Sequence, residues 1–174
     1  MHDTKPTEGT RLRPIARQDL ELVLAWRNHP DIRRFMYTQH EITLQEHLNW
    51  FESTLENPRR RAFVFELSGH PSGFVNFSIS AKGGIADWGF YAAPGTPRGT
   101  GSKLGETALR HAYASMRLHK VCGQALAHNE RSIRFHERLG FRREGTLRDQ
   151  HFDGAHYHSV VCFGLLAHEW QPRP

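Results

Sequence analysis

Three consecutive segments rich in β-branched and aromatic residues constrain the fold more than any other feature of this chain. They are AFVFEL, GFVNFSIS and IADWGFY, at residues 62–67, 73–80 and 85–91. The turn sequences SGHPSG and AKGG separate them, and each segment is too short for a stable helix. The pattern predicts three neighbouring antiparallel strands in the middle of the chain.

The N-terminal third predicts a strand followed by two or three helices. TRLRPI begins a strand, and residues 18–28 place apolar side chains at helical spacing. His29-Pro30 ends this helix, because the residue before a proline avoids the helical region. Thr43 and Glu46 then form a T-x-x-E capping box, which predicts a further helix. This helix covers residues 44–55, with Leu44, Leu48, Phe51 and Leu55 as its expected inner stripe.

The C-terminal half alternates helices and strands. Its expected elements are a helix beginning near Ser102, a strand over 120–127, a helix over 130–139 closed by Gly140, and strands 141–152 and 155–166 joined by a turn at Asp153-Gly154. The whole order predicts an α/β (α+β) fold, with a mixed, mostly antiparallel sheet of seven strands flanked by helices. We expect a single domain over residues 1–174, with residues 1–9 flexible.

Composition places the chain among soluble globular proteins. Its 174 residues are 38% hydrophobic and 24% charged, which is ordinary for that class. The first ten residues lack the apolar core of a signal peptide, and no apolar run approaches the roughly 20 residues of a membrane span. We therefore expect a cytoplasmic protein with no membrane partner. Cys122 and Cys162 lie in apolar segments without a metal-binding spacing, so buried free thiols are expected.

The formal net charge of +5 favours an anionic partner, such as a nucleotide cofactor, a nucleotide sugar or RNA. The densest basic run, Arg59-Arg60-Arg61, is expected to be a solvated loop, and contact with an anionic ligand is the lesser alternative. No aromatic residues alternate with basic ones as in a nucleic-acid interface, so no nucleic-acid partner is expected. The thirteen histidines include no H-E-x-x-H motif, and His156 and His158 form one alternating pair, so no metal is expected.

A glycine-rich loop precedes the helix that begins near Ser102. In PRGTGSKLGETALRHAY, Gly99 and Gly101 stand directly before apolar residues at helical spacing. Free N–H groups and the positive end of the helix dipole bind phosphate at such a position, and glycines let the backbone approach closely. The loop is neither a Walker A motif nor G-x-G-x-x-G. A purely structural turn would give the same pattern, so the loop alone leaves both interpretations open.

A second motif, NERSIRFHERLGF at residues 129–141, follows one strand later, and the two motifs together resemble the GNAT acyl-CoA N-acetyltransferase superfamily. In that family, a loop of arginine or glutamine, x-x-G-x-G/A binds the pyrophosphate of acetyl-CoA. Lys103 stands where the family usually has a glycine or alanine, which adds a charge beside the phosphates. The resemblance implies a pyrophosphate loop made of Arg98, Gly99, Thr100, Gly101, Ser102 and Lys103.

The second motif matches the family at Asn129, Ser132, Ile133, Gly140 and Phe141, with His136 in place of a family tyrosine. The resemblance extends from Arg11 to about Leu166, and it implies the GNAT fold. In that fold the strands corresponding to residues 85–91 and 120–127 splay apart, and pantetheine pairs with the edge around Leu126. Asn129 and Ser132 are implied to bind acetyl-CoA with them.

The N-terminal third of the chain resembles one subgroup of this superfamily more than the others. WRNHPDIRRFMY followed by EHLNWF is similar to the N-acetyltransferases that act on UDP-linked 4-amino sugars, as in pseudaminic acid synthesis (PseH-like). The tryptophan-arginine-asparagine element also occurs in ribosomal-protein N-terminal acetyltransferases. By analogy, Arg27, Met36 and His47 would line the acceptor pocket. The alternatives are a core position for Met36 and ordinary helix-surface positions for Arg27 and His47.

Acetyl transfer from a thioester to an amine needs a polarised carbonyl, a neutral amine and a proton for the departing thiolate. Backbone N–H groups near Phe90 and Tyr91 are candidates for holding the carbonyl oxygen. His136 is the candidate acid, although a histidine of pKa about 6.5 is only partly protonated at neutral pH. The alternative is a core-facing histidine, because Ile133 and His136 share a helix face with Gly140.

The catalytic base is less defined. Members of the subgroup often carry an acidic residue where Gln124 stands, and a glutamine cannot take a proton. Water relayed past Gln124 and His47 is one option, and an amine that loses its proton to solvent is another. Asp87 is the nearest other carboxylate on the strand before the loop.

The sequence therefore predicts an acetyl-CoA-dependent N-acetyltransferase that acts on the amine of a nucleotide-activated amino sugar, of the UDP-4-amino-4,6-dideoxy-N-acetylaltrosamine type. Direct attack in a ternary complex is expected, because no cysteine is placed as an acyl carrier. Acetylation of a protein N-terminus and a non-catalytic acyl-CoA-binding module are the alternatives. The oligomeric state is open, and a homodimer is compatible with the resemblance.

Overall fold

The computed structural model describes residues 9–80 and 82–172, and its centre is a seven-stranded sheet. The strand order is β1-β2-β3-β4-β5-β7-β6, and all neighbouring pairs are antiparallel except β4 and β5. The predicted mixed, mostly antiparallel sheet is confirmed. The prediction of flexible residues at the N-terminus falls, for residues 1–8, outside the described residues. The strands are β1 (Thr10–Pro14), β2 (Arg60–Leu67), β3 (His70–Ile79), β4 (Ile85–Ala92), β5 (Lys120–Leu126), β6 (Arg142–Phe152) and β7 (Tyr157–Leu166).

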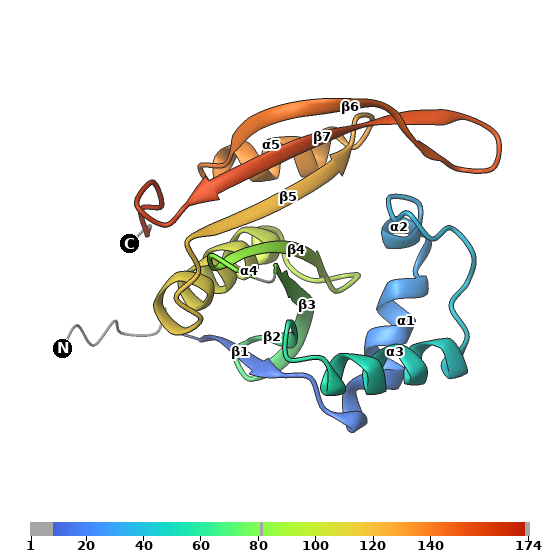
Figure 1. Ribbon diagram of the computed structural model, residues 1–174. Coiled ribbons are helices and arrows are strands. Elements are labelled where there is room, and N and C mark those ends of the chain that lie inside the picture. Colours follow the sequence, from blue (N-terminus) through green and yellow to red (C-terminus); the bar gives the residue numbers. More distant parts are fainter. Residues whose placement is uncertain (1–8, 81, 173–174) are drawn as a thin grey trace.

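Helices cover both faces of this sheet. On one face, Val23 and Phe51 of the first and third helices pack against Val64 and Phe74 of the sheet. On the other face, Leu104 and Phe135 belong to the larger core cluster. Figure 1 shows α1 and α3 together, with α2 facing the carboxyl end of β5. The helices are α1 (Leu20–Asn28), α2 (Pro30–Arg33), α3 (Leu44–Glu56), α4 (Thr100–Arg110) and α5 (Glu130–Arg138), with a 3-10 turn at Arg17–Asp19 and a π-helical turn at His111–Ser115.

The two parallel strands separate soon after they begin. Residues 85–87 of β4 pair with residues 120–122 of β5, and the pairing then stops. Beyond that point β4 remains paired with β3 as far as Ala92, and β5 remains paired with β7 as far as Leu126. Figure 1 shows the two halves of the sheet diverging between β4 and β5. The predicted splay is confirmed, and this opening between the two strands is the β4–β5 gap.

Local sequence signals set the ends of several elements as expected. α1 ends at Asn28, and Pro30 occupies the first turn of the short α2. At the start of α3, Glu46 N–H donates to Thr43 Oγ1 at 3.2 Å, and Thr43 N–H donates to Glu46 Oε2 at 2.7 Å. This reciprocal capping box confirms the predicted helix start. The β6–β7 turn uses Gly154 at φ +100°.

The exposed face of α3 differs from the prediction. Phe51 is buried and Leu48 packs against the same core cluster, as expected, but Leu44 and Leu55 are 46% and 65% exposed. His47 and Thr54 are buried instead. Residues 47, 51 and 54 also lie on one helical face, and packing against α1 and the sheet selected this face rather than the more apolar one. The polar character of this buried face points to a function for it.

Three smaller expectations are also corrected. α4 begins at Thr100, two residues before the predicted start. Arg60 and Arg61 open β2 instead of lying in a solvated loop, because β2 pairs with β3 from Arg60 onward. Cys122 and Cys162 are free thiols, but they are half-buried rather than fully buried. Among the described residues, no helix has the length and apolar character needed to cross a bilayer.

Candidate active site

The β4–β5 gap presents backbone groups without a strand partner. Residues 88–92 of β4 and 123–126 of β5 each pair on one side only. Successive N–H groups of a strand point in opposite directions, so only one of Phe90 and Tyr91 can direct its N–H into the gap. Leu126 is buried and pairs with Val160, and its carbonyl accepts the Asn129 N–H at 2.8 Å. The gap is therefore bordered by two strand edges, and an extended chain can form backbone hydrogen bonds with either of them.

The glycine-rich loop gives α4 an open N-terminus. Gly99 lies immediately before α4 at φ +93°, and no side chain caps the helix. A Cβ added to Gly99 or Gly101 would meet no atom within 4 Å, so the space in front of this turn is open. Arg98, Ser102 and Lys103 are exposed beside it. Thr100 differs, because it is buried and its hydroxyl donates to Pro97 O at 2.8 Å. Open N–H groups beside two cations fit a bound pyrophosphate.

Asn129 and Ser132 have structural contacts at the start of α5. The Asn129 side chain caps the helix by accepting the Ser132 N–H at 3.1 Å. The Ser132 carbonyl faces the ring of His136, whose Nδ1 lies 2.8 Å away. Both residues therefore position α5 beside the gap, and their predicted contacts with acetyl-CoA stay predictions.

His136 is buried between α5 and the sheet, with 1% of its surface exposed. Its Nδ1 lies 2.8 Å from Ser132 O, which fixes that nitrogen as the protonated one. Its Nε2 accepts a hydrogen bond from Trp88 Nε1 at 3.1 Å, and the ring stacks on Phe163. Burial lowers the pKa of His136 to about 4, although the bond to Ser132 O opposes this. The arrangement favours the core-histidine alternative, and the acid role stays a prediction.

Arg27 and His47 lie near each other on the α1–α3 side of the sheet. The guanidinium of Arg27 donates to Thr38 O at 3.3 Å, and its Nη1 is buried without a partner among the described residues. Burial lowers the pKa of Arg27, and burial raises that of its neighbour Tyr91. His47 is 6% exposed, its ring stacks on Trp50, and burial lowers its pKa. Its Nε2 is a second buried polar atom without a partner in the described chain.

Met36 and Gln124 are linked by a residue that the sequence did not single out. Met36 is half-buried in the segment after α2, and its carbonyl accepts a hydrogen bond from Gln39. The next residue, Tyr37, donates its hydroxyl proton to Gln124 Oε1 at 2.7 Å. The contact joins positions 87 residues apart, so no local pattern predicts it. This hydrogen bond holds the Tyr37 hydroxyl against Gln124 of β5, beside the gap.

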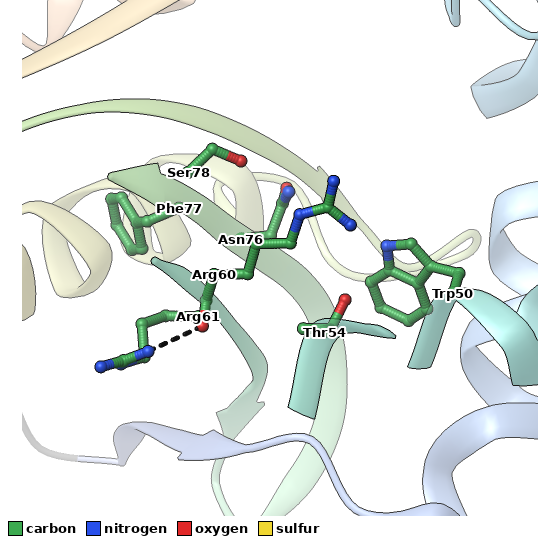
Figure 2. A pocket seen from close by; sticks show the side chains of 7 residues that line it. All are labelled: Trp50, Thr54, Arg60, Arg61, Asn76, Phe77 and Ser78. Carbon is green, nitrogen blue, oxygen red and sulfur yellow. Dashed lines mark hydrogen bonds between the residues drawn. The ribbon is translucent and has the colours of Figure 1, made fainter. Parts of the chain in front are cut away.

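A cavity of about 230 Å³ lies over the sheet on the α3 side (Figure 2). Asn76 and Ser78 of β3 pair with Gly89 and Asp87 of β4, so one strand, β4, lies between this wall of the cavity and β5. Thr54 Oγ1 is buried without a partner in the described chain. The lining residues are Trp50, Thr54, Arg60, Arg61, Asn76, Phe77 and Ser78.

The two arginines of the cavity differ in direction. Figure 2 shows the Arg60 guanidinium between Asn76 and Trp50, whereas that of Arg61 points away from them. Arg61 Nη1 donates to Pro58 O at 2.6 Å and to Arg60 O at 2.9 Å. None of the seven lining residues is acidic. The cavity therefore combines the Arg60 guanidinium, whose Nη1 also donates to Ser53 Oγ at 3.4 Å, with an indole and neutral hydrogen-bonding groups, which suits an anionic or aromatic ligand.

Sequence reasoning missed Tyr37, Trp50 and Thr54, and it gave Arg60 a contact with an anionic ligand only as the lesser alternative. A signal for two of them was present, because residues 47, 50 and 54 recur on one side of the capped helix 44–55. The apolar residues of that helix suggested a different inner face. Among the described residues, no cluster of three or more histidine, cysteine or acidic side chains could hold a metal ion.

Comparisons with known proteins give matches over most of the chain. The acetyltransferase (GNAT) domain model matches residues 10–142. The acetyltransferase PseH of Campylobacter jejuni subsp. jejuni serotype O:23/36 is 26% identical over 140 residues, 80% of this chain and 84% of that one. The uncharacterized SPbeta prophage-derived N-acetyltransferase YokL of Bacillus subtilis is 30% identical over 126 residues, 70% of each chain.

A solved structure shares the fold. Spermidine N-acetyltransferase from Vibrio cholerae, in complex with CoA and spermine, superposes with a TM-score of 0.86 at 21% identity. The superposition covers 94% of this chain and 98% of that one. At this identity the likeness establishes the fold and leaves the acceptor substrate open.

Proposed function

Because the chain belongs to the acetyltransferase (GNAT) family, we propose that it transfers the acetyl group of acetyl-CoA to the amine of a nucleotide-activated amino sugar. The family model covers most of the chain, and named N-acetyltransferases of three kinds are among its relatives. Acetyl-CoA-dependent N-acetyltransferase activity follows from membership of the family. The choice of a nucleotide sugar as acceptor is the proposal, and the resemblance to PseH supports it.

The cationic cavity beside the gap carries this proposal. A polyamine acceptor is a polycation and would need carboxylates around it. The cavity instead offers the Arg60 guanidinium and no acidic residue among its lining side chains. Arginine binds phosphate through two parallel hydrogen bonds, and an indole packs against a flat base. A nucleotide-linked acceptor therefore matches the charge of the cavity lining, whereas spermidine matches it poorly.

The predicted roles of the other residues form one arrangement. Arg98 and Lys103 with the open turn at Gly99 and Gly101 would bind the pyrophosphate of acetyl-CoA. Pantetheine would extend through the gap along β5. Arg27, Met36 and His47 would contact the acceptor on the α1–α3 side. Arg27 Nη1 and His47 Nε2 are among the buried polar atoms without a hydrogen-bond partner in the described chain, and a polar ligand would satisfy them.

Release of free thiol from acetyl-CoA by the purified protein tests this proposal. Three acceptors are compared: a UDP-linked 4-amino-4,6-dideoxy sugar, an N-terminal ribosomal peptide and spermidine. Saturable turnover on the sugar alone supports the proposal. Turnover on the peptide or spermidine, with none on the sugar, would replace the acceptor class but keep the acetyl-CoA site. Binding of acetyl-CoA without turnover of any amine would favour the acyl-CoA-binding alternative. A cytoplasmic location, the lack of a nucleic-acid partner and a homodimer stay predictions.

A further inference from the structure

The hydroxyl of Tyr37 lies at the mouth of the β4–β5 gap. It is 2.7 Å from Gln124 Oε1, and Gln124 is two residues beyond Cys122, the last residue of β5 that pairs with β4. If the register of Asp87 with Cys122 is continued, Gln124 stands opposite Gly89 across the gap. The Tyr37–Gln124 pair thus occupies the place where the two strands first part.

Gln124 faces the acceptor side of the sheet. A Cβ on the preceding residue, Gly123, would collide with His136 and Trp88, so that position faces α5. Side chains alternate along a strand, so the Gln124 side chain faces the opposite side, toward α1–α3. Tyr37 reaches it from the segment after α2, which Arg27 holds at Thr38 and Asn28 holds at Ile42. The hydroxyl is therefore held in place from two directions.

The α5 side of the gap offers no comparable proton donor. His136 is the candidate there, and its two ring nitrogens are both engaged, with Ser132 O and with Trp88 Nε1. Its Nε2, the nitrogen nearer the sheet, accepts a hydrogen bond and carries no proton to give. Tyr37 is 51% exposed, so a ligand can reach its hydroxyl, and its one proton can pass from Gln124 Oε1 to a charged thiolate, which is the stronger acceptor.

We propose that Tyr37 is a catalytic residue of the acetyl transfer, and that its hydroxyl gives a proton to the sulfur of the departing CoA. The inference rests on the acetyltransferase activity of the proposed function but not on the identity of the acceptor. Gln124 acts as the positioning residue that holds the hydroxyl in place. His136 stands where the family usually has a tyrosine, and Tyr37, in the segment after α2, would supply a tyrosine hydroxyl in its place.

Tyr37 gives one proton and takes one back, so the acetyl transfer needs no second proton-transfer group. The amine nitrogen forms a bond to the thioester carbonyl carbon, and the carbon–sulfur bond breaks with its electron pair leaving on sulfur. The Tyr37 hydroxyl proton goes to that sulfur. The Tyr37 oxygen then takes the proton that the acetylated nitrogen loses. While that oxygen is negatively charged, the Gln124 amide turns so that Nε2 donates to it in place of Oε1, which accepts from it in the structure. No carboxylate base is required, which agrees with the glutamine at position 124.

The surroundings of Tyr37 keep it protonated at neutral pH. Burial raises the pKa of Tyr37, and the nearby Cys162 raises it further. Its ring contacts His151 at a centroid distance of 5.1 Å. A phenol with a pKa above 10 can protonate a thiolate, because it retains its proton throughout the range in which the enzyme works.

The first test measures the pKa of the CoA thiol while CoA is bound, from the ultraviolet absorbance of the thiolate. A hydroxyl that donates to the thiolate stabilises the charged form, so we expect this pKa to be about one pH unit lower in the wild type than in Tyr37→Phe. Tyr157→Phe removes an exposed phenol hydroxyl at the start of β7 and should keep the wild-type value. Equal values in the wild type and Tyr37→Phe, or no saturable CoA binding, would overturn the proposal.

The second test measures turnover with any amine that the wild type acetylates. We expect Tyr37→Phe to lower kcat about 100-fold or more with little change in KM for acetyl-CoA. Gln124→Met removes the partner of the hydroxyl but keeps the hydroxyl itself, so it should lower kcat less. Equal losses in the two variants would show that Tyr37 only anchors its loop. Because the first test needs no acceptor, a failure of the nucleotide-sugar proposal leaves the test of Tyr37 intact.

Discussion

The ring of His136 fills the space that Gly123 leaves open on β5. A Cβ at Gly123 would collide with His136 Nε2 and would lie 2.9 Å from Trp88 Nε1. The ring also packs against Phe141 and Phe163. An imidazole in this position joins α5 to both separated strands, because Trp88 belongs to β4 and Gly123 to β5. The two strands are therefore held apart by packing beneath the gap.

The buried ring of His136 should make stability depend on pH. Its pKa is about 4 in the folded protein, against 6.5 for an ordinary histidine. Between these values the unfolded chain binds a proton that the folded chain does not. The free energy of unfolding should therefore fall as the pH drops from about 6.5 to about 4, by on the order of 3 kcal/mol from this group.

Urea unfolding of the wild type and His136→Phe at several pH values measures this contribution. The variant should show a shallower loss of stability over the same range. His168→Gln, at an exposed position after β7, is the matched control and should follow the wild type. A slope in His136→Phe as steep as that of the wild type would contradict the prediction. Turnover by His136→Phe at an undiminished rate would also exclude the acid role of His136.

Arg60 should control the use of an anionic acceptor. Arg60→Met keeps most of the side-chain stem but removes the guanidinium beside Asn76 and Trp50. Charged hydrogen bonds to phosphate are worth enough that kcat/KM for the nucleotide sugar should fall about 10- to 100-fold. Arg61→Met is the control, because that guanidinium points away from the cavity, and its kcat/KM should stay near the wild type. Steady-state kinetics measure kcat/KM for both variants. Equal losses in Arg60→Met and Arg61→Met would contradict the role of Arg60 in binding the acceptor.

At the scale of elements, α4 and α3 each combine packing in a hydrophobic core with groups that face a binding site. α4 presents an open N-terminus at Gly99 while burying Leu104, Ala108 and Leu109 in the larger core. α3 buries Phe51 in the smaller core while the same face presents His47 and Thr54 to the acceptor side. Binding and packing groups therefore share a helix, and they can be separated by substitutions at different positions of one element.

Two glycines of α4 provide such a separation. Gly101→Val places a side chain in open space at the first turn of α4, so stability should change little while the Kd for CoA rises at least about 10-fold. Gly105→Ala places a Cβ 2.6 Å from Leu139 Cδ1 and 2.8 Å from Phe135 Cζ, so it should lower the free energy of unfolding by about 1–3 kcal/mol. Calorimetric CoA binding and urea unfolding of both variants check this. Unchanged CoA affinity in Gly101→Val would remove the pyrophosphate role of the loop.

At the scale of the whole molecule, the gap connects the two faces of the sheet. The open end of α4 belongs to the helix that packs with α5 on one face, and the cavity lies under α3 on the other. Acetyl-CoA and the acceptor would therefore approach from different sides and meet between β4 and β5. Such an arrangement suits direct transfer in a ternary complex, as the sequence predicts.

The net charge of +5 should make both substrates sensitive to salt. A tenfold rise in ionic strength shortens the screening length about threefold, which weakens attraction between the protein and anionic ligands. The KM values for acetyl-CoA and for the nucleotide sugar should both rise, with kcat nearly constant. The free amino sugar without its nucleotide serves as the control acceptor, and its KM should not rise. Salt-independent KM values for both anionic substrates would contradict the prediction.

Local sequence patterns determined the order of the elements and the position of the glycine-rich loop. The capping box of Thr43 and Glu46, the break at Pro30 and the turn at Gly154 each act within a few residues, so each could be predicted from sequence. The two GNAT-like motifs likewise lie within single segments, and the splay of two strands followed from the resemblance that they carry.

Only the tertiary structure decided which side chains meet. The face of α3 that is buried depends on α1 and on the sheet, and the helical period alone allowed an apolar and a polar solution. Arg60 becomes part of a cavity because β2 pairs with β3 and α3 lies above them. Tyr37 meets Gln124 across 87 positions of sequence. The sequence by itself determined the elements, because their signals are local, whereas the site arises from contacts between distant segments that no local period encodes.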